Sequence, residues 1–189
     1  MAGVGNRWRE LTSRRRMLLG AGALGGAVLL DGCGAGKPRA PRNPEVNGVD
    51  ADLLDEVFML ENMAIAAYAH VSGSLTGPAR TLAERIGRQE VEHALKLAPV
   101  IHALGGEPTP ELPDYGFPRL ASAEAALAFV GGIEGKVIGG YIDVIPKITN
   151  AAARAFAVSI VANEAQHLAL VTQARGLAPT GEAIVRGTA

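Results

Sequence analysis

The chain has 189 residues, of which 48% are hydrophobic and only 4% are aromatic. This length suffices for one well-buried domain, and the shortage of aromatic residues favours helices over an all-β fold. The formal net charge of −1 provides no global field that would attract nucleic acid. Because Cys33 is the single cysteine, a disulfide framework and a cysteine-based metal cluster are excluded, and any metal ligands must be carboxylates and histidines.

Residues 1–33 have the features of an export signal. Three arginines at 14–16 precede a moderately apolar stretch from Met17 to Leu30. These 14 residues are too short to span a bilayer as a stable helix and have the length of a signal's apolar region. Residues 13–18, Ser-Arg-Arg-Arg-Met-Leu, resemble the twin-arginine export motif. We therefore expect an exported protein that faces the periplasm or the cell envelope.

The end of this segment resembles a lipobox, the motif in which a cysteine is lipidated and becomes the new N-terminus. Its residues are Leu-Asp-Gly-Cys at 30–33, and Asp31 departs from the pattern because a small or hydroxylic residue usually stands there. We expect membrane attachment through a lipid on Cys33, with an uncleaved N-terminal anchor as the alternative. Residues 34–49, rich in Gly, Pro, Lys and Arg, are expected to form a flexible tether.

Apolar residues recur at three- and four-residue spacing in four segments of residues 50–176, which predicts an all-α four-helix bundle. The first helix would start at Asp50 or Asp52 as its N-cap and end around residues 72–78. The second would begin near Pro78 and stop at the glycine pair 105–106.

A long crossover is predicted for residues 105–121, because they contain four prolines. Such a connection would keep the third helix from doubling back beside the second. The third helix would open after Ser122 and break at Pro146, and the fourth would end near Gly176. Residues 177–189 are expected to be a disordered tail.

Two Glu-x-x-His motifs stand on the predicted inner faces of the second and fourth helices. A Glu and a His three apart on a helix point the same way, and here that direction is the apolar stripe. The two other helices each carry one Glu on their apolar stripe. The six candidate metal ligands are thus Glu61, Glu90, His93, Glu134, Glu164 and His167.

These side chains predict a site for two divalent cations. Four carboxylates buried together cost several kcal/mol each unless they are paired, and the basic residues of the second helix, Arg85, Arg88 and Lys96, fall on its outer face. Two divalent cations would balance the four acids. Oxygen-rich sites with a little imidazole suit iron or manganese.

The two halves of the bundle repeat the same spacing of residues. Glu61 is followed seven residues later by Tyr68, and Glu134 is followed seven residues later by Tyr141. The spacing from the lone Glu to the Glu of Glu-x-x-His is 29 residues in the first half and 30 in the second. This pattern indicates a repeated helical hairpin with one half-site in each copy.

The pattern resembles the ferritin-like superfamily of di-iron and di-manganese carboxylate bundles, which has one Glu on each of two helices and Glu-x-x-His on each of the other two. The resemblance implies that Glu90 and Glu164 bridge both metal ions. It also implies that Glu61 and Glu134 are terminal ligands, each on one metal.

By the same resemblance, His93 and His167 would each bind one metal ion. Tyr68 and Tyr141 would be hydrogen-bond donors beside the ligands or redox-active neighbours, and core tyrosines are the alternative. The cofactor implied is a pair of iron ions, or alternatively a pair of manganese ions.

Such a centre is expected to make the protein an oxidoreductase that acts on Fe(II) with O₂, or on peroxide. Electrons would come from Fe(II) itself or from an external donor, because the chain has no cysteine site for electron transfer. Two alternatives stay open: a non-enzymatic iron carrier tethered to the membrane, and an enzyme similar to manganese catalase. The oligomeric state stays open, with a homo-oligomer as one option.

Overall fold

The structure is a computed structural model, and it describes residues 44–180 and residue 187. The predicted export signal, the lipidation candidate Cys33 and residues 34–43 of the predicted tether lie outside the described residues, as does most of the predicted tail.

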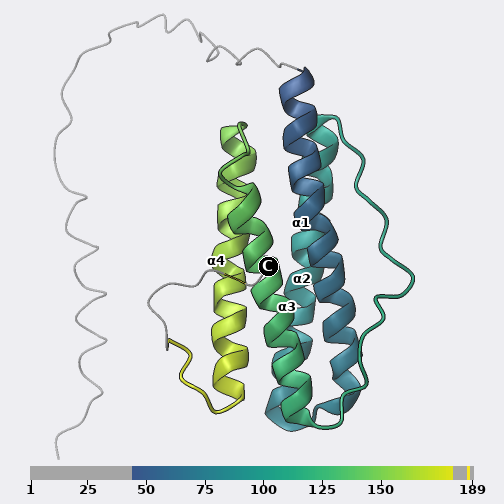
Figure 1. Ribbon diagram of the computed structural model, residues 1–189, viewed down its shortest axis with the longest axis vertical. Coiled ribbons are helices and arrows are strands. Elements are labelled where there is room, and N and C mark those ends of the chain that lie inside the picture. Colours follow the sequence, from purple (N-terminus) through teal and green to yellow (C-terminus); the bar gives the residue numbers. More distant parts are fainter. Residues whose placement is uncertain (1–43, 181–186, 188–189) are drawn as a thin grey trace, which may run out of the picture. The chain divides into compact units, whose positions relative to one another are not determined.

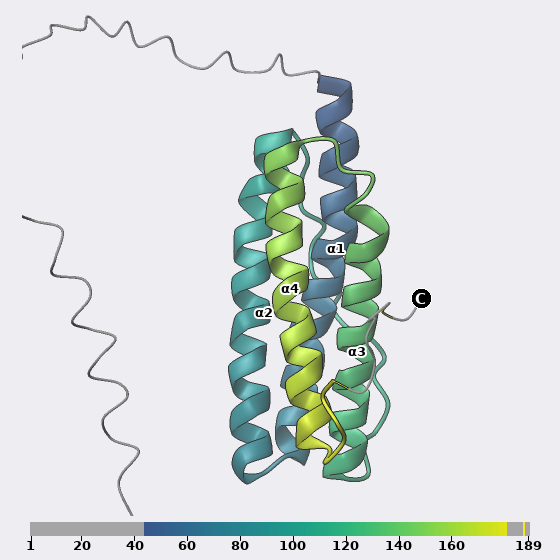
Figure 2. The same ribbon diagram turned by 90° about the vertical axis from the view of Figure 1, so that its left-hand side faces the viewer.

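Four long helices make up the bundle: α1 Pro44–Val71, α2 Gly77–Leu104, α3 Ala123–Val144 and α4 Ala151–Ala174, with a short 3-10 turn η3 Ser72–Ser74 after α1. No strand occurs within residues 44–180. Figures 1 and 2 show α1 and α2 as one antiparallel pair, α3 and α4 as another, with α1 beside α3 and α2 beside α4. The predicted all-α four-helix bundle is confirmed.

Most helix ends have the chemistry that the sequence indicates. The backbone of Gly105 has φ 93°, a left-handed conformation that suits glycine and ends α2. The side chain of Ser122 accepts a hydrogen bond from the backbone N–H of Ala125 and so caps α3. Asn150 caps α4 in the same way, through the N–H groups of Ala152 and Ala153.

The start of α1 differs from the prediction. The helix begins at Pro44, six residues before the expected start at Asp50, and proline is well suited to a first helical turn. Asp50 is therefore not an N-cap. Its buried carboxylate accepts hydrogen bonds from the N–H (2.8 Å) and the hydroxyl (3.0 Å) of Thr149 and from the N–H of Asn150 (2.7 Å), which ties the α3–α4 connection to α1.

The predicted crossover is confirmed, because residues 105–122 run the length of the bundle and α3 lies beside α1 rather than α2 (Figure 1). The carboxylate of Asp55 in α1 accepts hydrogen bonds from the N–H (2.8 Å) and the hydroxyl (2.6 Å) of Thr109. Further along, Nε2 of His70 lies 2.9 Å from the carbonyl oxygen of Pro118. The crossover is thus fastened to α1 near both of its ends.

Among the described residues, α3 is the one helix long and apolar enough, by length and composition, to cross a membrane. Half of its most apolar window is buried inside the bundle. It also carries the fully buried Glu134. We therefore interpret α3 as a core helix of the bundle.

Candidate metal centre

The six predicted ligand residues lie together in the interior of the bundle. Each helix contributes one glutamate, and all four glutamates have an exposed fraction of 0%. α2 and α4 add the two histidines, of which His167 is 1% exposed and His93 is 8% exposed. His93 is thus the member of the cluster nearest to solvent.

The cluster consists of two overlapping groups of four side chains, and within each group the ligand atoms lie within 4.8 Å of one another. The first group contains Glu61, Glu90, His93 and Glu164. The second contains Glu90, Glu134, Glu164 and His167. Two glutamates, Glu90 and Glu164, belong to both groups, so their carboxylates stand between the two half-sites.

The imidazole nitrogens face the shared carboxylates across the bundle. Nδ1 of His93 in α2 lies 2.7 Å from Oε1 of Glu164 in α4, and Nδ1 of His167 in α4 lies 2.8 Å from Oε1 of Glu90 in α2. The two imidazole rings are 5.7 Å apart between centroids, at an interplanar angle of 24°. The His93–Glu164 and His167–Glu90 contacts are therefore related by an approximate two-fold axis.

The donor atoms of this cluster fit metal ions. Both carboxylate oxygens of Glu90, both of Glu164 and Oε2 of Glu134 are buried, and the imidazole Nδ1 atoms are the only donors near them among the described residues. Buried carboxylates left unpaired cost several kcal/mol each, and a bound cation removes that cost. As predicted, the basic residues of α2 at positions 85, 88 and 96 are exposed and not directed at the cluster. Oxygen and imidazole donors suit iron or manganese.

Protons take the place of cations when no metal is bound. Burial raises the pKa of Glu61 to about 8, and burial likewise holds the pKa of Glu134 well above its ordinary value. Burial alone would lower the pKa of His93, but hydrogen bonds with Glu164 and Glu61 outweigh it and raise that pKa to about 12. Metal binding at this cluster must therefore release protons.

In the metal-free cluster, Glu164 is ionised beside two protonated imidazoles. Burial would raise the pKa of Glu164, but hydrogen bonds with His167 and His93 outweigh it and lower that pKa to about 2. Burial would lower the pKa of His167, but hydrogen bonds with Glu164 and Glu90 raise it to about 9.

The two tyrosines donate to the carboxylates of the opposite half. The hydroxyl of Tyr68 in α1 donates to Oε1 of Glu134 in α3. The hydroxyl of Tyr141 in α3 donates to Oε1 of Glu61 in α1. Burial, together with the neighbouring carboxylate charge, holds both tyrosine pKa values well above the ordinary value, so both remain hydroxyl donors.

Two polar residues beside the cluster were not predicted. Nε2 of His93 lies 3.0 Å from Oδ1 of Asn163 in α4, and Nε2 of His167 lies 3.1 Å from Oε1 of Gln89 in α2. The signal for them was present in the sequence, because an amide residue directly precedes the Glu of each Glu-x-x-His motif. By contrast, Glu92 and Gln166, inside those motifs, are exposed.

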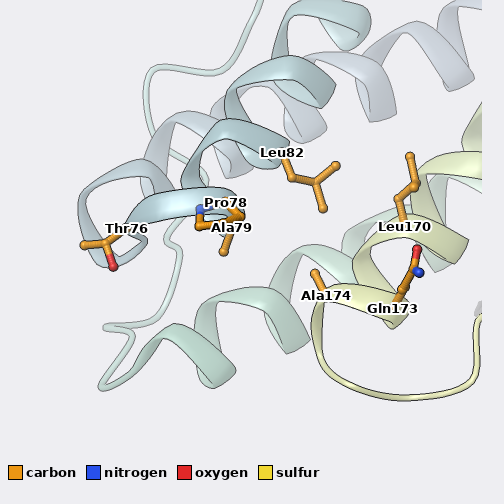
Figure 3. Close-up of a pocket in the computed structure, with 7 residues that line it drawn as sticks. All are labelled: Thr76, Pro78, Ala79, Leu82, Leu170, Gln173 and Ala174. Carbon is orange, nitrogen blue, oxygen red and sulfur yellow. The ribbon is translucent and has the colours of Figure 1, made fainter.

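A cavity of about 420 Å³ opens between the start of α2 and the end of α4. Figure 3 shows Leu82 extending from α2 toward α4, with Leu170 and Gln173 on the α4 side. Its lining includes none of the six clustered residues. Leu170 stands one turn after His167, so the cavity lies along the same α2–α4 interface as the cluster.

The family model of the ferritin-like domain matches residues 49–177. The chain belongs to the ferritin-like family. The matched residues include α1 from residue 49 onward, the whole of α2, α3 and α4, and all six clustered residues, which confirms the resemblance seen in the sequence. A comparison with curated protein sequences found no match for this ferritin-like protein.

Solved structures show the same fold. A bacterioferritin from Desulfovibrio desulfuricans, described with its diiron site in different catalytic states, has a TM-score of 0.64 and 18% identity, covering 80% of this chain and 97% of its own. A ferritin-like diiron-carboxylate protein from Bacillus anthracis has a TM-score of 0.58 and 23% identity, covering 69% and 97%. A conserved hypothetical protein, rv2844, from Mycobacterium tuberculosis has a TM-score of 0.63 and 18% identity, covering 67% and 96%.

Proposed function

We propose that this ferritin-like protein binds two iron ions in the bundle interior and uses them as an oxidoreductase, acting on Fe(II) with O₂ or on peroxide. The observation that carries the proposal is the position of Glu90 and Glu164. Both carboxylates belong to both ligand groups, and all four of their oxygens are buried with no donor near them, among the described residues, except the two imidazole Nδ1 atoms. Each would contact both metal ions.

The remaining ligands would serve one ion each. Glu61 and His93 would hold the first, and Glu134 and His167 the second, as the two groups divide them. A pair of iron ions supplies two one-electron changes of oxidation state, which is the chemistry needed to reduce O₂ or peroxide. The similar proteins named for a diiron-carboxylate fold and for a diiron site support iron.

The surrounding side chains would hold this centre and control access to it. The tyrosine hydroxyls hydrogen-bond to the terminal carboxylates Glu61 and Glu134 and so fix their orientation. The bundle excludes water from the four glutamates, whose exposed fraction is 0%. Because His93 retains 8% exposure, a small oxidant or Fe(II) would approach on its side.

We further propose that the protein works outside the cytoplasm. The support lies in the sequence of residues 1–33, with its three arginines, its apolar stretch and its lipobox-like end at Cys33. Attachment at Cys33 would place the bundle at the membrane surface of the cell envelope.

The deciding experiment is an anaerobic Fe(II) titration of the purified, metal-depleted full-length protein, followed by O₂ or peroxide. We expect two Fe(II) per chain and a rapid rise of near-ultraviolet absorption as ferric carboxylate forms. Absence of metal binding would refute the proposal. Tight binding of two Fe(II) with no oxidation by either oxidant would indicate the iron carrier instead. Retention of manganese with sustained O₂ release from peroxide would indicate the catalase-like enzyme.

A further inference from the structure

We propose that Gln89 and Asn163 are positioning residues, which hold the two imidazoles with Nε2 protonated and the Nδ1 lone pair directed at the metal pair. The inference rests on the proposed two-metal centre but not on its reaction. Neither residue belongs to the two ligand groups, and each would act through a histidine.

The contacts are reciprocal across the α2–α4 interface. Asn163 precedes Glu164 in α4 and its amide oxygen lies 3.0 Å from Nε2 of His93 in α2. Gln89 precedes Glu90 in α2 and its amide oxygen lies 3.1 Å from Nε2 of His167 in α4. Each helix thus supplies a shared carboxylate and, one residue earlier, the acceptor for the histidine of the other helix.

An oxygen acceptor at Nε2 fixes the identity of the other ring nitrogen. The Nε2–H group donates to the amide oxygen, so a neutral imidazole has its lone pair at Nδ1. In both histidines Nδ1 faces the shared carboxylates, at 2.7 Å from Glu164 for His93 and at 2.8 Å from Glu90 for His167. Without metal, a proton on Nδ1 bridges each of these short contacts. A metal ion would displace that proton and take both the Nδ1 lone pair and the carboxylate oxygen as ligands.

The amides also keep the charge of the centre balanced. Four glutamates and two divalent ions sum to zero when both imidazoles are neutral, and a neutral amide leaves that sum unchanged. Histidine ligands often donate to a carboxylate instead, which would add a negative charge beside a buried centre. Compared with a carboxylate in the same place, each amide therefore favours the divalent state of the metals over the trivalent state.

The test uses leucine and acidic variants of the full-length protein. Gln89→Leu and Asn163→Leu remove the acceptor, and loss of such a partner typically lowers metal affinity 10- to 100-fold, so we expect about that loss in a competitive chelator titration with Co(II). Gln89→Glu and Asn163→Asp keep an acceptor and should restore Co(II) affinity. In the iron-loaded protein they should lower the reduction potential, because they add negative charge. Gln166→Leu is the control, since Gln166 is exposed and bonds only to the carbonyl of Ala162.

A second measurement reports the ring nitrogens directly. In the proton NMR spectrum of the Co(II)-loaded protein, the two Nε2–H groups should give two resonances shifted by the paramagnetic metal. Each leucine variant should speed the exchange of one of these protons with solvent. Unchanged affinity and unchanged exchange in both leucine variants would overturn the inference while leaving the metal centre standing. So would equal losses of affinity in Gln89→Glu and Gln89→Leu. A wild-type protein that binds no Co(II) or Fe(II) would overturn the proposed function as well.

Discussion

The hydroxyl of Tyr141 in α3 donates a hydrogen bond of 2.5 Å to Oε1 of Glu61 in α1. The corresponding bond from Tyr68 in α1 to Glu134 in α3 runs in the opposite direction. Each half of the repeat therefore orients the lone glutamate of the other half, Glu61 or Glu134. The two hairpins are thus linked beside the cluster by two hydrogen bonds between α1 and α3.

Removal of the Tyr141 hydroxyl should weaken one metal position more than the other. In Tyr141→Phe, Oε1 of Glu61 loses its donor, and we expect about a tenfold loss of affinity at the position that Glu61 and His93 share. The stability should fall by about 1–3 kcal/mol, because a buried acceptor is left unpaired. Stepwise metal titration and thermal unfolding would measure the two effects.

Tyr115→Phe is the matched control for this substitution, because Tyr115 lies in the crossover, stacked on Phe117 and away from the cluster. Equal weakening of both metal positions by Tyr141→Phe would contradict the assignment of Glu61 to one position.

Loss of a shared carboxylate should disturb both metal ions, whereas loss of a terminal one should disturb one. We expect Glu90→Gln and Glu164→Gln to lower occupancy at both positions, and Glu134→Gln to leave about one metal per chain. The number of metal ions per chain, measured by mass spectrometry after gel filtration, distinguishes a shared ligand from a terminal one. Glu92→Gln, two residues from Glu90 but exposed, should retain two metals. Full occupancy in both shared-residue variants would refute the bridging role.

The stability of the metal-free protein should fall as the pH rises from about 5 to about 9. Folding raises the pKa of Glu61 from 4.5 to about 8 and that of His167 from 6.5 to about 9. The folded state therefore binds more protons than the unfolded state, and each group's contribution is lost as the pH passes through its folded pKa.

Below pH 4.5 the trend should reverse. The pKa of Glu164 is lowered from 4.5 to about 2 in the fold, so its contribution is lost as the pH falls through that range. Urea unfolding of the metal-free protein at pH 3, 5, 7 and 9 would show a maximum near pH 5. The free energy of unfolding of the metal-loaded protein should vary less between pH 7 and 9. If the stability of the metal-free protein rises over that range, the folded state does not bind more protons than the unfolded state, and the prediction is wrong.

Asp50 should be the most costly acidic residue to remove outside the metal centre. In Asp50→Ala, the backbone N–H groups of Thr149 and Asn150 lose their acceptor in the part-buried α3–α4 connection. A loss of about 2–3 kcal/mol in the free energy of unfolding is expected. Asp52, two residues later in α1 and exposed, provides the control, and Asp52→Ala should change stability by less than about 0.5 kcal/mol. Equal effects of the two substitutions would contradict the role of Asp50.

Replacement of Cys33 should abolish the proposed lipidation. In Cys33→Ala, we expect loss of incorporated radiolabelled fatty acid and, once the signal is cleaved, movement of the protein from the membrane to the soluble fraction. Labelling of the variant at the wild-type level would show that Cys33 is not the lipidated residue.

Much of the centre could be predicted from sequence because helical periodicity decides which side chains share a face. The spacing of Glu90 and His93, and of Glu164 and His167, was sufficient to place them in the interior. The start of α1 was not predictable in this way. The glycines and prolines of residues 34–49 are typical of a linker, although the helix begins at Pro44.

The contacts between helices could not be read from periodicity. The role of Asp50 depends on a connection that lies about a hundred residues further along the chain. The contacts of Gln89 with His167 and of Asn163 with His93 depend on α2 and α4 being neighbours. In each case the missing information was which helices are neighbours.

The repeat of the helical hairpin has a consequence for the origin of the protein. Each hairpin supplies a terminal glutamate, a Glu-x-x-His motif, a tyrosine and an amide, and every one of these groups acts together with the other hairpin. Two identical hairpins related by a two-fold axis would contain the same set of ligands and the same crossed hydrogen bonds. A homodimeric ancestor could thus have had the whole centre before gene duplication and fusion, with the crossover of residues 105–122 as the later joint.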